Sequence, residues 1–244
     1  MISSVEFPTH STWPAPWSSH SDDKEMFAVA REQTLNLIQW LARIANSYVA
    51  GDLPEDRMAL NFRADGAFVT KTFDRDIALE MRLPGLEMQF QEAGKLAAHI
   101  LDPEERSPAE VEAWILVELL HRGVDRDKFS KSLPYTIKNL ITGDAEDYSP
   151  RACAAGLRQL LSWFCVASSV LSNDGNVVCL PQTLMLVEVP GRQILGTGFS
   201  PGDAEFDEPY FFMGGSGKRR VLKASELAND ADPAAAVAQF IKRG

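Results

Sequence analysis

The segment from Gly196 to Gly214 carries the residue types best suited to chemistry or binding. It combines glycines, prolines, carboxylates and aromatic side chains in one loop between two expected strands. Loops that join backbone-shaping residues to polar and aromatic ones often form binding surfaces. The sequence therefore predicts a binding site in this segment, with these candidate residues: Gly198, Phe199, Pro201, Asp203, Glu208 and Tyr210.

Four carboxylates stand close together in this loop, at Asp203, Glu205, Asp207 and Glu208. Clustered carboxylates can hold a hard cation such as Mg²⁺ or Ca²⁺, although this spacing is not that of an EF-hand, because Glu208 stands where that loop requires glycine. A carboxylate in a water-poor pocket can also act as a general base. Three interpretations stay open: a metal ligand, a polar anchor for another ligand, and a hydrated loop.

Other catalytic signatures are incomplete in this chain. The stretch from Met213 to Arg219 lacks two residues of a phosphate-binding loop, because Phe212 replaces its first glycine and Arg219 replaces its Ser or Thr. The four histidines form no His-x-x-x-His pair, and no Gly-x-Ser-x-Gly elbow is present. His121 stands at the end of an expected helix, where a cation complements the helix dipole.

Trp13 and Trp17 stand in an N-terminal arm, residues 1–21, that has little periodicity. Large aromatic side chains of this kind can clamp a ligand or partner, or they can attach the arm to the core through their apolar area. The sequence leaves both alternatives open.

Composition limits the class of protein. The chain has 244 residues, of which 45% are hydrophobic and 24% charged, and its formal net charge is −10. Such an acidic balance disfavours nucleic acid as a partner. No secretory signal is expected at the N-terminus, and the apolar run Leu160–Leu171 is shorter than the roughly 20 residues that span a bilayer. We therefore expect no membrane partner. Three cysteines cannot all pair, so we expect reduced thiols and a cytoplasmic protein.

Hydrophobic periodicity predicts the elements that must position the loop. A stripe of apolar residues at helical spacing follows Asp22 and ends near Gly51, with Gln39 and Arg43 mostly on the opposite side. The further elements expected are strands from Met58 to Phe90, a strand or short helix over 94–101, a helix capped by Ser107, a helix capped by Ser149, strands over 176–199, a hairpin of 210–213 with 219–223, and a helix capped by Asp232.

This order predicts an α+β fold in which helices cover antiparallel sheets. Residues 22–244 form either one continuous domain or two similar helix–strands–helix halves, 22–124 and 146–244. Two such halves would create a cleft, a common site for small ligands.

Several landmarks resemble a bacterial family known as domain-of-unknown-function family 5996. They are Trp13-Pro14, Ser107, Tyr148-Ser149-Pro150, the Gly-Phe-x-Pro-Gly motif at 198–202, Glu208-Pro209-Tyr210-Phe211-Phe212, and Asp232-Pro233. The chain departs from the family at Asn36 and Thr197, where members carry His, and at Ser200, where members carry Trp. The resemblance implies a shared fold and supplies no activity.

Taken together, the residues favour a non-catalytic module that binds a small molecule or a protein partner through the loop from Gly198 to Tyr210. The alternative is a carboxylate- or metal-dependent enzyme that uses the acidic loop 203–208. Neither a cofactor nor an oligomeric state follows from the sequence.

Overall fold

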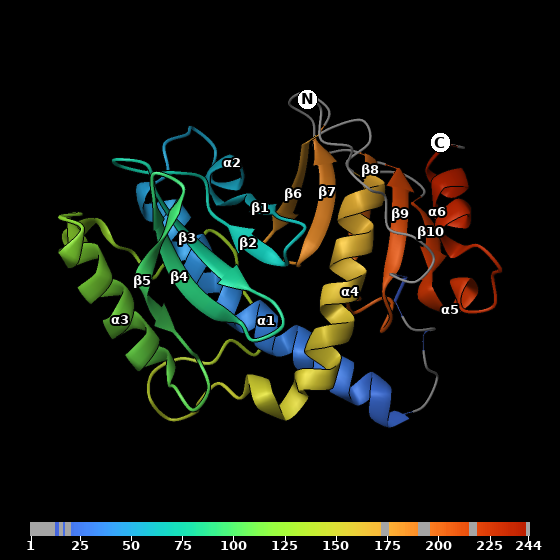
Figure 1. The fold of residues 1–244 in the computed structure, drawn as a ribbon, viewed down its shortest axis with the longest axis horizontal. Helices are drawn as coiled ribbons and strands as arrows, with labels where there is room; N and C mark the ends of the chain where they lie inside the picture. Colours follow the sequence, from blue (N-terminus) through green and yellow to red (C-terminus); the bar gives the residue numbers. More distant parts are fainter. Residues whose placement is uncertain are drawn as a thin grey trace.

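The computed structural model describes residues 13, 14, 17, 21–171, 176–189, 196–214 and 219–242. They form an α+β fold with helices packed on a single antiparallel sheet of ten strands, rather than on separate sheets (Figure 1). The sequence prediction of an antiparallel α+β fold is thus confirmed.

The helices are α1 (Ser21–Tyr48), α2 (Pro54–Met58), α3 (Pro108–His121), α4 (Ala154–Leu171), α5 (Ala224–Leu227) and α6 (Pro233–Lys242), with the 3-10 helices η2 (Arg126–Lys128) and η3 (Pro150–Cys153). The strands are β1 (Leu60–Phe62), β2 (Ala67–Val69), β3 (Ile77–Arg82), β4 (Glu87–Glu92), β5 (Lys95–Leu101), β6 (Asn176–Leu180), β7 (Met185–Val189), β8 (Gly196–Ser200), β9 (Tyr210–Gly214) and β10 (Arg220–Lys223).

The sheet consists of two meanders of five strands, each running outward from the centre. Strands β1–β5 form one antiparallel meander and β6–β10 form another, in the order β10-β9-β8-β7-β6-β1-β2-β3-β4-β5. The two meanders join where β1 pairs with β6, with Leu60 opposite Cys179. Each meander follows a long helix, α1 or α4, and is followed by shorter helices. The element order therefore contains helix–strands–helix twice.

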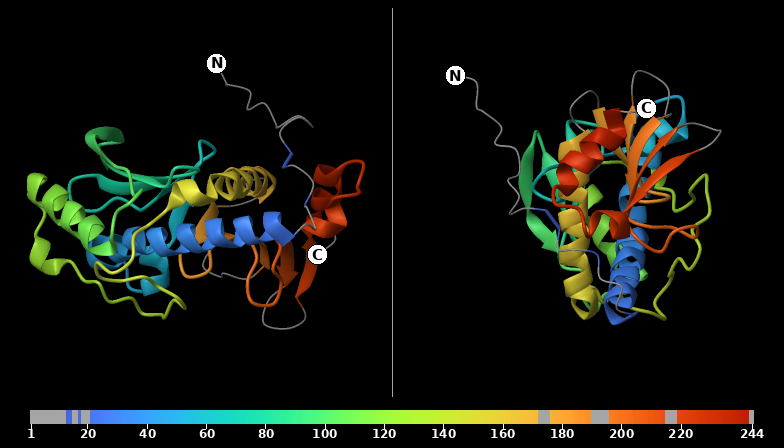
Figure 2. Two further views of the ribbon diagram at one scale, coloured as in Figure 1. Left: turned by 90° about the horizontal axis from the view of Figure 1, so that it is seen from below. Right: turned by 90° about the vertical axis from the view of Figure 1, so that its right-hand side faces the viewer.

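Helix α1 is the long axis of the core. It runs along most of the described molecule in Figure 2, between the strand pair β3–β4 and the strands of the second meander. The predicted apolar stripe is buried, and two polar residues predicted mostly on the opposite side are buried as well: Gln39 is fully buried and Arg43 is 6% exposed. Gln39 Nε2 donates to the carbonyl of Pro181 at 2.8 Å, and Arg43 Nε donates to that of Lys131 at 3.2 Å. Helix α1 is therefore covered on more than one side.

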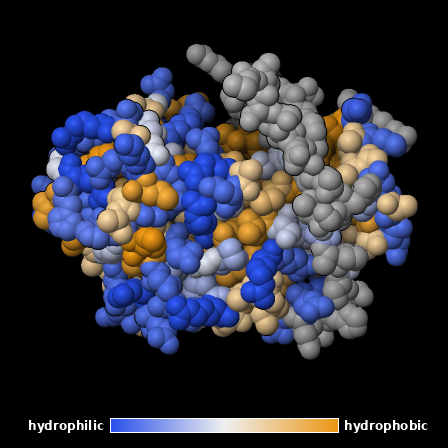
Figure 3. All heavy atoms as spheres, viewed as in Figure 1, coloured by the Kyte–Doolittle hydropathy of each residue, from blue (hydrophilic) through white to orange (hydrophobic). Residues whose placement is uncertain are grey.

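Helix α4 packs along α1 at very close range. A Cβ atom at Gly156 would lie 2.5 Å from the carbonyl oxygen of Met26, so only glycine allows this contact. With η3, the helical segment Pro150–Leu171 has 22 residues and contains an 18-residue window with a mean hydropathy of 1.3, which by length and composition alone would suffice to cross a membrane. The apolar run Leu160–Leu171 considered from the sequence is only a part of this segment. In the structure 44% of this window is buried, and hydrophobic residues gather towards the middle of the surface in Figure 3, where α4 lies.

Two predicted helix caps have different outcomes. Ser107 forms the expected capping box with Glu110 at the start of α3. Ser149 makes no side-chain cap bond, because the chain first forms η3 and enters α4 only at Ala154.

Two predictions about strands also have different outcomes. Residues 95–101 form the strand β5. Met58 ends helix α2 instead of starting a strand.

Candidate functional site

The predicted binding loop joins β8 to β9, and its two aromatic ends belong to the core. The Phe199 and Tyr210 side chains are fully buried. The Phe199 ring lies 5.6 Å from that of Phe164 and 5.3 Å from that of Phe211, centroid to centroid. The Phe199 ring is also nearly parallel to the Trp163 indole, with 13° between the two ring planes and 6.2 Å between their centroids. Phe199 therefore fixes the position of α4 over the sheet.

Gly198 is required by packing. It stands opposite Phe212 in the β8–β9 ladder. A Cβ atom at this position would lie 2.3 Å from Cζ of Phe212 and 2.6 Å from the carbonyl oxygen of Leu186. The absence of a side chain lets the Phe212 ring approach the backbone of β8 closely.

Asp203 organises the loop from within. Its Oδ1 accepts hydrogen bonds from the backbone N–H groups of Glu205, at 2.9 Å, and Phe206, at 3.0 Å, and its Oδ2 accepts one from the Tyr210 hydroxyl. Burial raises the pKa of Asp203, but these hydrogen bonds outweigh that effect and hold it below its ordinary value. Burial and the Asp203 contact raise the pKa of Tyr210 to about 12. At neutral pH the pair is therefore a carboxylate and a phenol.

Two arginines flank the loop. Arg219 Nη2 donates to the Tyr210 hydroxyl at 2.8 Å, and its guanidinium lies over the Tyr210 and Phe212 rings at 5.0 and 5.2 Å. Arg31 of α1 donates to the carbonyl of Pro201 at 3.4 Å. Both contacts tie the loop to its surroundings.

Glu208 connects the loop to the C-terminal helices. Its carboxylate accepts hydrogen bonds from the backbone N–H of Ser225, at 2.7 Å, and from the Ser225 hydroxyl, at 3.0 Å. The backbone N–H of Ala224 donates to the Pro209 carbonyl at 2.8 Å. Glu208 and Pro209 thereby set the position of α5.

A hollow of about 100 Å³ lies beside α5, between α4, α6 and the N-terminal arm. Its lining consists of Trp13, Trp17, Trp163, Ala224, Leu227, Ala228, Asp230 and Pro233. The Trp13 and Trp163 rings meet nearly at right angles, at 75° with centroids 6.1 Å apart. Trp17 is held edge-on against Phe27 of α1, at 87° and 5.1 Å. Three indoles therefore enclose a small space.

Two polar features accompany these aromatic walls. Asp230, at the rim, is exposed, and its Oδ1 accepts a hydrogen bond from the backbone N–H of Asp232 at 2.8 Å. Trp163 is 2% exposed, and its Nε1 donor has no hydrogen-bond partner among the described residues. Such buried, unpaired donors are rare in folded proteins, so this one marks Trp163 as unusual.

The structure thus relates the predicted loop to the hollow indirectly. Phe199 supports Trp163 from the sheet side, and Glu208 anchors α5, while Gly198, Pro201 and Asp203 shape the loop itself; none of these residues lines the hollow. Sequence reasoning considered Trp13 and Trp17 as a clamp but missed Trp163. Its only signal was a large aromatic residue within an almost wholly apolar helix.

Comparison with known proteins gives no match to a family model, a curated protein or a solved structure. The resemblance to family 5996 stays a prediction.

Proposed function

We propose that this chain is a non-catalytic binding module and that the hollow under Trp13, Trp17 and Trp163 binds a methylated ammonium group. The observation that carries the proposal is the enclosure of a small space by three indoles with a carboxylate, Asp230, at its rim. A methylated ammonium group belongs either to a small molecule or to a methylated lysine of a protein partner, and both have the same chemistry.

Cation–π attraction favours this ligand over a neutral one. The faces of indole rings attract cations, with tryptophan the strongest of the aromatic side chains. The interaction contributes about 0.5–1 kcal/mol at exposed sites and about 2 kcal/mol where water is excluded. The Trp13 and Trp163 rings touch edge to face with nearly perpendicular planes, so a cation in the corner beside this contact can approach both rings. The Asp230 carboxylate adds Coulomb attraction at the open side.

The hollow can take part of such a group. Its volume is about 100 Å³, and the exposed Asp230 in its lining marks an open side, so methyl groups of the ammonium head can enter while the remainder stays outside. A quaternary ammonium head is compact and poorly hydrated, and the rest of the ligand would extend outward past Asp230.

The alternative, an enzyme that uses a carboxylate from residues 203–208, gains no support from these contacts. Asp203 is hydrogen-bonded on both oxygens and its pKa is lowered, which makes it a weak base. The side chains of Glu205 and Asp207 are 68% and 75% exposed. Glu208 is engaged with Ser225.

The test is isothermal titration of the full chain with tetramethylammonium, with choline and with the neutral tert-butyl isostere of choline. We expect choline and tetramethylammonium to bind and the isostere to bind at least tenfold more weakly. A trimethyl-lysine peptide, titrated beside its unmodified form, then separates a protein partner from a small molecule as the source of the ligand. Equal binding of choline and its neutral isostere would contradict the proposal.

Two charge variants provide the matched comparison. Asp230→Asn keeps an oxygen that can accept from the Asp232 N–H and removes the charge, so binding should weaken about threefold to tenfold, as a partly screened ion pair of roughly 1 kcal/mol implies. Asp207→Asn removes a carboxylate of the loop that is 75% exposed, and it should leave binding unchanged.

A further inference from the structure

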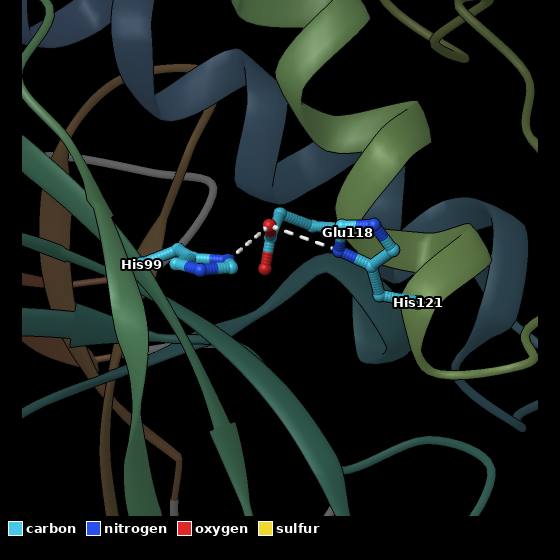
Figure 4. A group of neighbouring side chains, drawn as sticks. All are labelled: His99, Glu118 and His121. Carbon is cyan, nitrogen blue, oxygen red and sulfur yellow. Dashed lines mark hydrogen bonds and ion pairs between the residues drawn. The ribbon is translucent and has the colours of Figure 1, made fainter.

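Two histidines and a glutamate converge at the opposite end of the sheet. His99 lies on the edge strand β5, and Glu118 and His121 lie on the last turns of α3, with their side chains directed toward one another (Figure 4). One ligand atom from each residue lies within 4.8 Å of the other two. The His99 and His121 side chains are 65% and 55% exposed, whereas that of Glu118 is 3% exposed. An ion from solvent could therefore reach a buried carboxylate between two accessible imidazoles.

The distances suit a tetrahedral metal centre. Nδ1 of His99 lies 2.9 Å from Oε1 of Glu118, and Nδ1 of His121 lies 3.7 Å from the same oxygen. Ligand atoms bound to zinc at about 2.0–2.1 Å are separated by roughly 3.3–3.4 Å when the geometry is tetrahedral. The two observed distances lie on either side of that value, so small rotations of the exposed imidazoles complete the arrangement.

Neighbouring groups hold the carboxylate in place. Arg122 Nη1 donates to Oε2 of Glu118 at 2.6 Å, which leaves Oε1 directed at the imidazoles. The Arg122 guanidinium is itself paired with Glu92, with 3.0 Å between Nε and Oε1. Partners of this kind orient metal ligands and support affinity. Among these contacts the two carboxylates, Glu118 and Glu92, outnumber the single Arg122 guanidinium.

From this cluster we infer that His99, Glu118 and His121 bind one divalent transition-metal ion of the zinc class, separately from the ligand proposed for the hollow. Imidazole nitrogen together with a carboxylate oxygen suits zinc, and two histidines with one glutamate form a known three-ligand set with a fourth position open to water. The ion would replace the hydrogen bond between His99 and Glu118 and would link the edge strand β5 to α3.

The experiment is calorimetric titration of the tag-free full chain with Zn²⁺ at pH 7.5, with thermal unfolding measured at each addition. We expect one ion per chain and a rise in the unfolding temperature, since a ligand that binds only the folded state stabilises it. Substitution by Co²⁺ should give visible absorption bands of tetrahedral nitrogen and oxygen coordination.

Exposed histidine variants keep the test independent of folding. His99→Ala and His121→Ala each should raise the Kd for Zn²⁺ at least tenfold while leaving the unfolding temperature without metal nearly unchanged. His20→Ala, a histidine remote in sequence, should bind Zn²⁺ like the unaltered chain. The inference is overturned if the chain binds no Zn²⁺ with one-to-one stoichiometry, or if either cluster variant binds as tightly as His20→Ala.

Discussion

The indole of Trp163 stacks on the phenyl ring of Phe199, with ring planes 13° apart and centroids separated by 6.2 Å. This contact joins the strand that begins the predicted loop to the helix that forms one wall of the hollow. A substitution of Phe199 should therefore affect ligand binding in the hollow, although Phe199 itself does not line it. The stack is the physical link between the loop and the proposed function.

Phe199→Ala tests that link. Removing a fully buried phenyl ring costs about 3–5 kcal/mol of unfolding free energy, measurable by urea unfolding. Phe199→Leu keeps most of the volume and should cost less, yet it should still weaken choline binding, because Trp163 loses its flat support. Leu53→Ala, at a side chain that is 57% exposed, is the control and should change neither quantity. Unaltered choline binding in Phe199→Leu would separate the loop from the hollow.

Tyr210→Phe examines the hydroxyl that lies between Asp203 and Arg219. The variant keeps the buried ring and removes the donor to Asp203 together with the acceptor for Arg219. We expect a loss of about 1–3 kcal/mol in unfolding free energy, because a charged partner is left incompletely bonded. In comparison, Tyr48→Phe removes one hydrogen bond at an exposed position, to the Asp125 carbonyl, and should cost at most about 1 kcal/mol. A smaller loss for Tyr210→Phe than for Tyr48→Phe would refute this role.

The pH dependence of stability follows from Asp203. Its pKa in the folded protein lies below the unfolded value of about 3.9. The carboxylate therefore contributes stability that is fully present above the unfolded pKa and is lost as the pH falls through the folded pKa. Asp203→Asn should be less stable than the unaltered chain at pH 7, and the difference should shrink between pH 4 and pH 2. Urea unfolding across this range gives the answer, and a difference that is constant with pH would show that Asp203 has no such effect.

Glu208→Ala should weaken ligand binding from outside the hollow. The substitution removes the carboxylate that accepts from the N–H and hydroxyl of Ser225 at the start of α5. Loss of a cap of this kind costs about 0.5–2 kcal/mol, and α5 supplies two residues of the hollow, Ala224 and Leu227. Glu205→Ala removes a neighbouring carboxylate that contacts Arg219 but not α5, so it serves as the control. If both variants bind choline equally well, α5 does not depend on Glu208.

Much of the fold could be predicted because local patterns determine it. The apolar stripe of α1, the capping box at Ser107 and the β9–β10 hairpin all depend on residues close together in sequence. The burial of Gln39 and Arg43 could not be predicted from local patterns. Their partners, the carbonyls of Pro181 and Lys131, come from distant segments. Periodicity shows which side of a helix is apolar but does not show whether its polar side is also covered.

The candidate sites were less predictable for the same reason. The loop from Gly198 to Tyr210 was conspicuous in sequence, yet its aromatic residues are buried and its carboxylates bond mostly within the protein. The Trp163 ring meets the Trp13 ring through a contact between segments far apart in the sequence. Likewise, His99 and His121 have no metal-binding spacing in the sequence, since one lies in β5 and the other in α3 and only the fold brings them together.

The most direct test of the central claim is the nuclear magnetic resonance spectrum of the five tryptophan indole N–H groups during titration with tetramethylammonium. Trp40 donates to Tyr148 at 3.0 Å and Trp114 packs on Phe90, and neither lines the hollow, so their signals serve as internal references. We predict saturable shifts for Trp13, Trp17 and Trp163, with Trp40 and Trp114 unchanged. Saturation that leaves the first three signals in place, or that moves all five equally, would contradict this prediction.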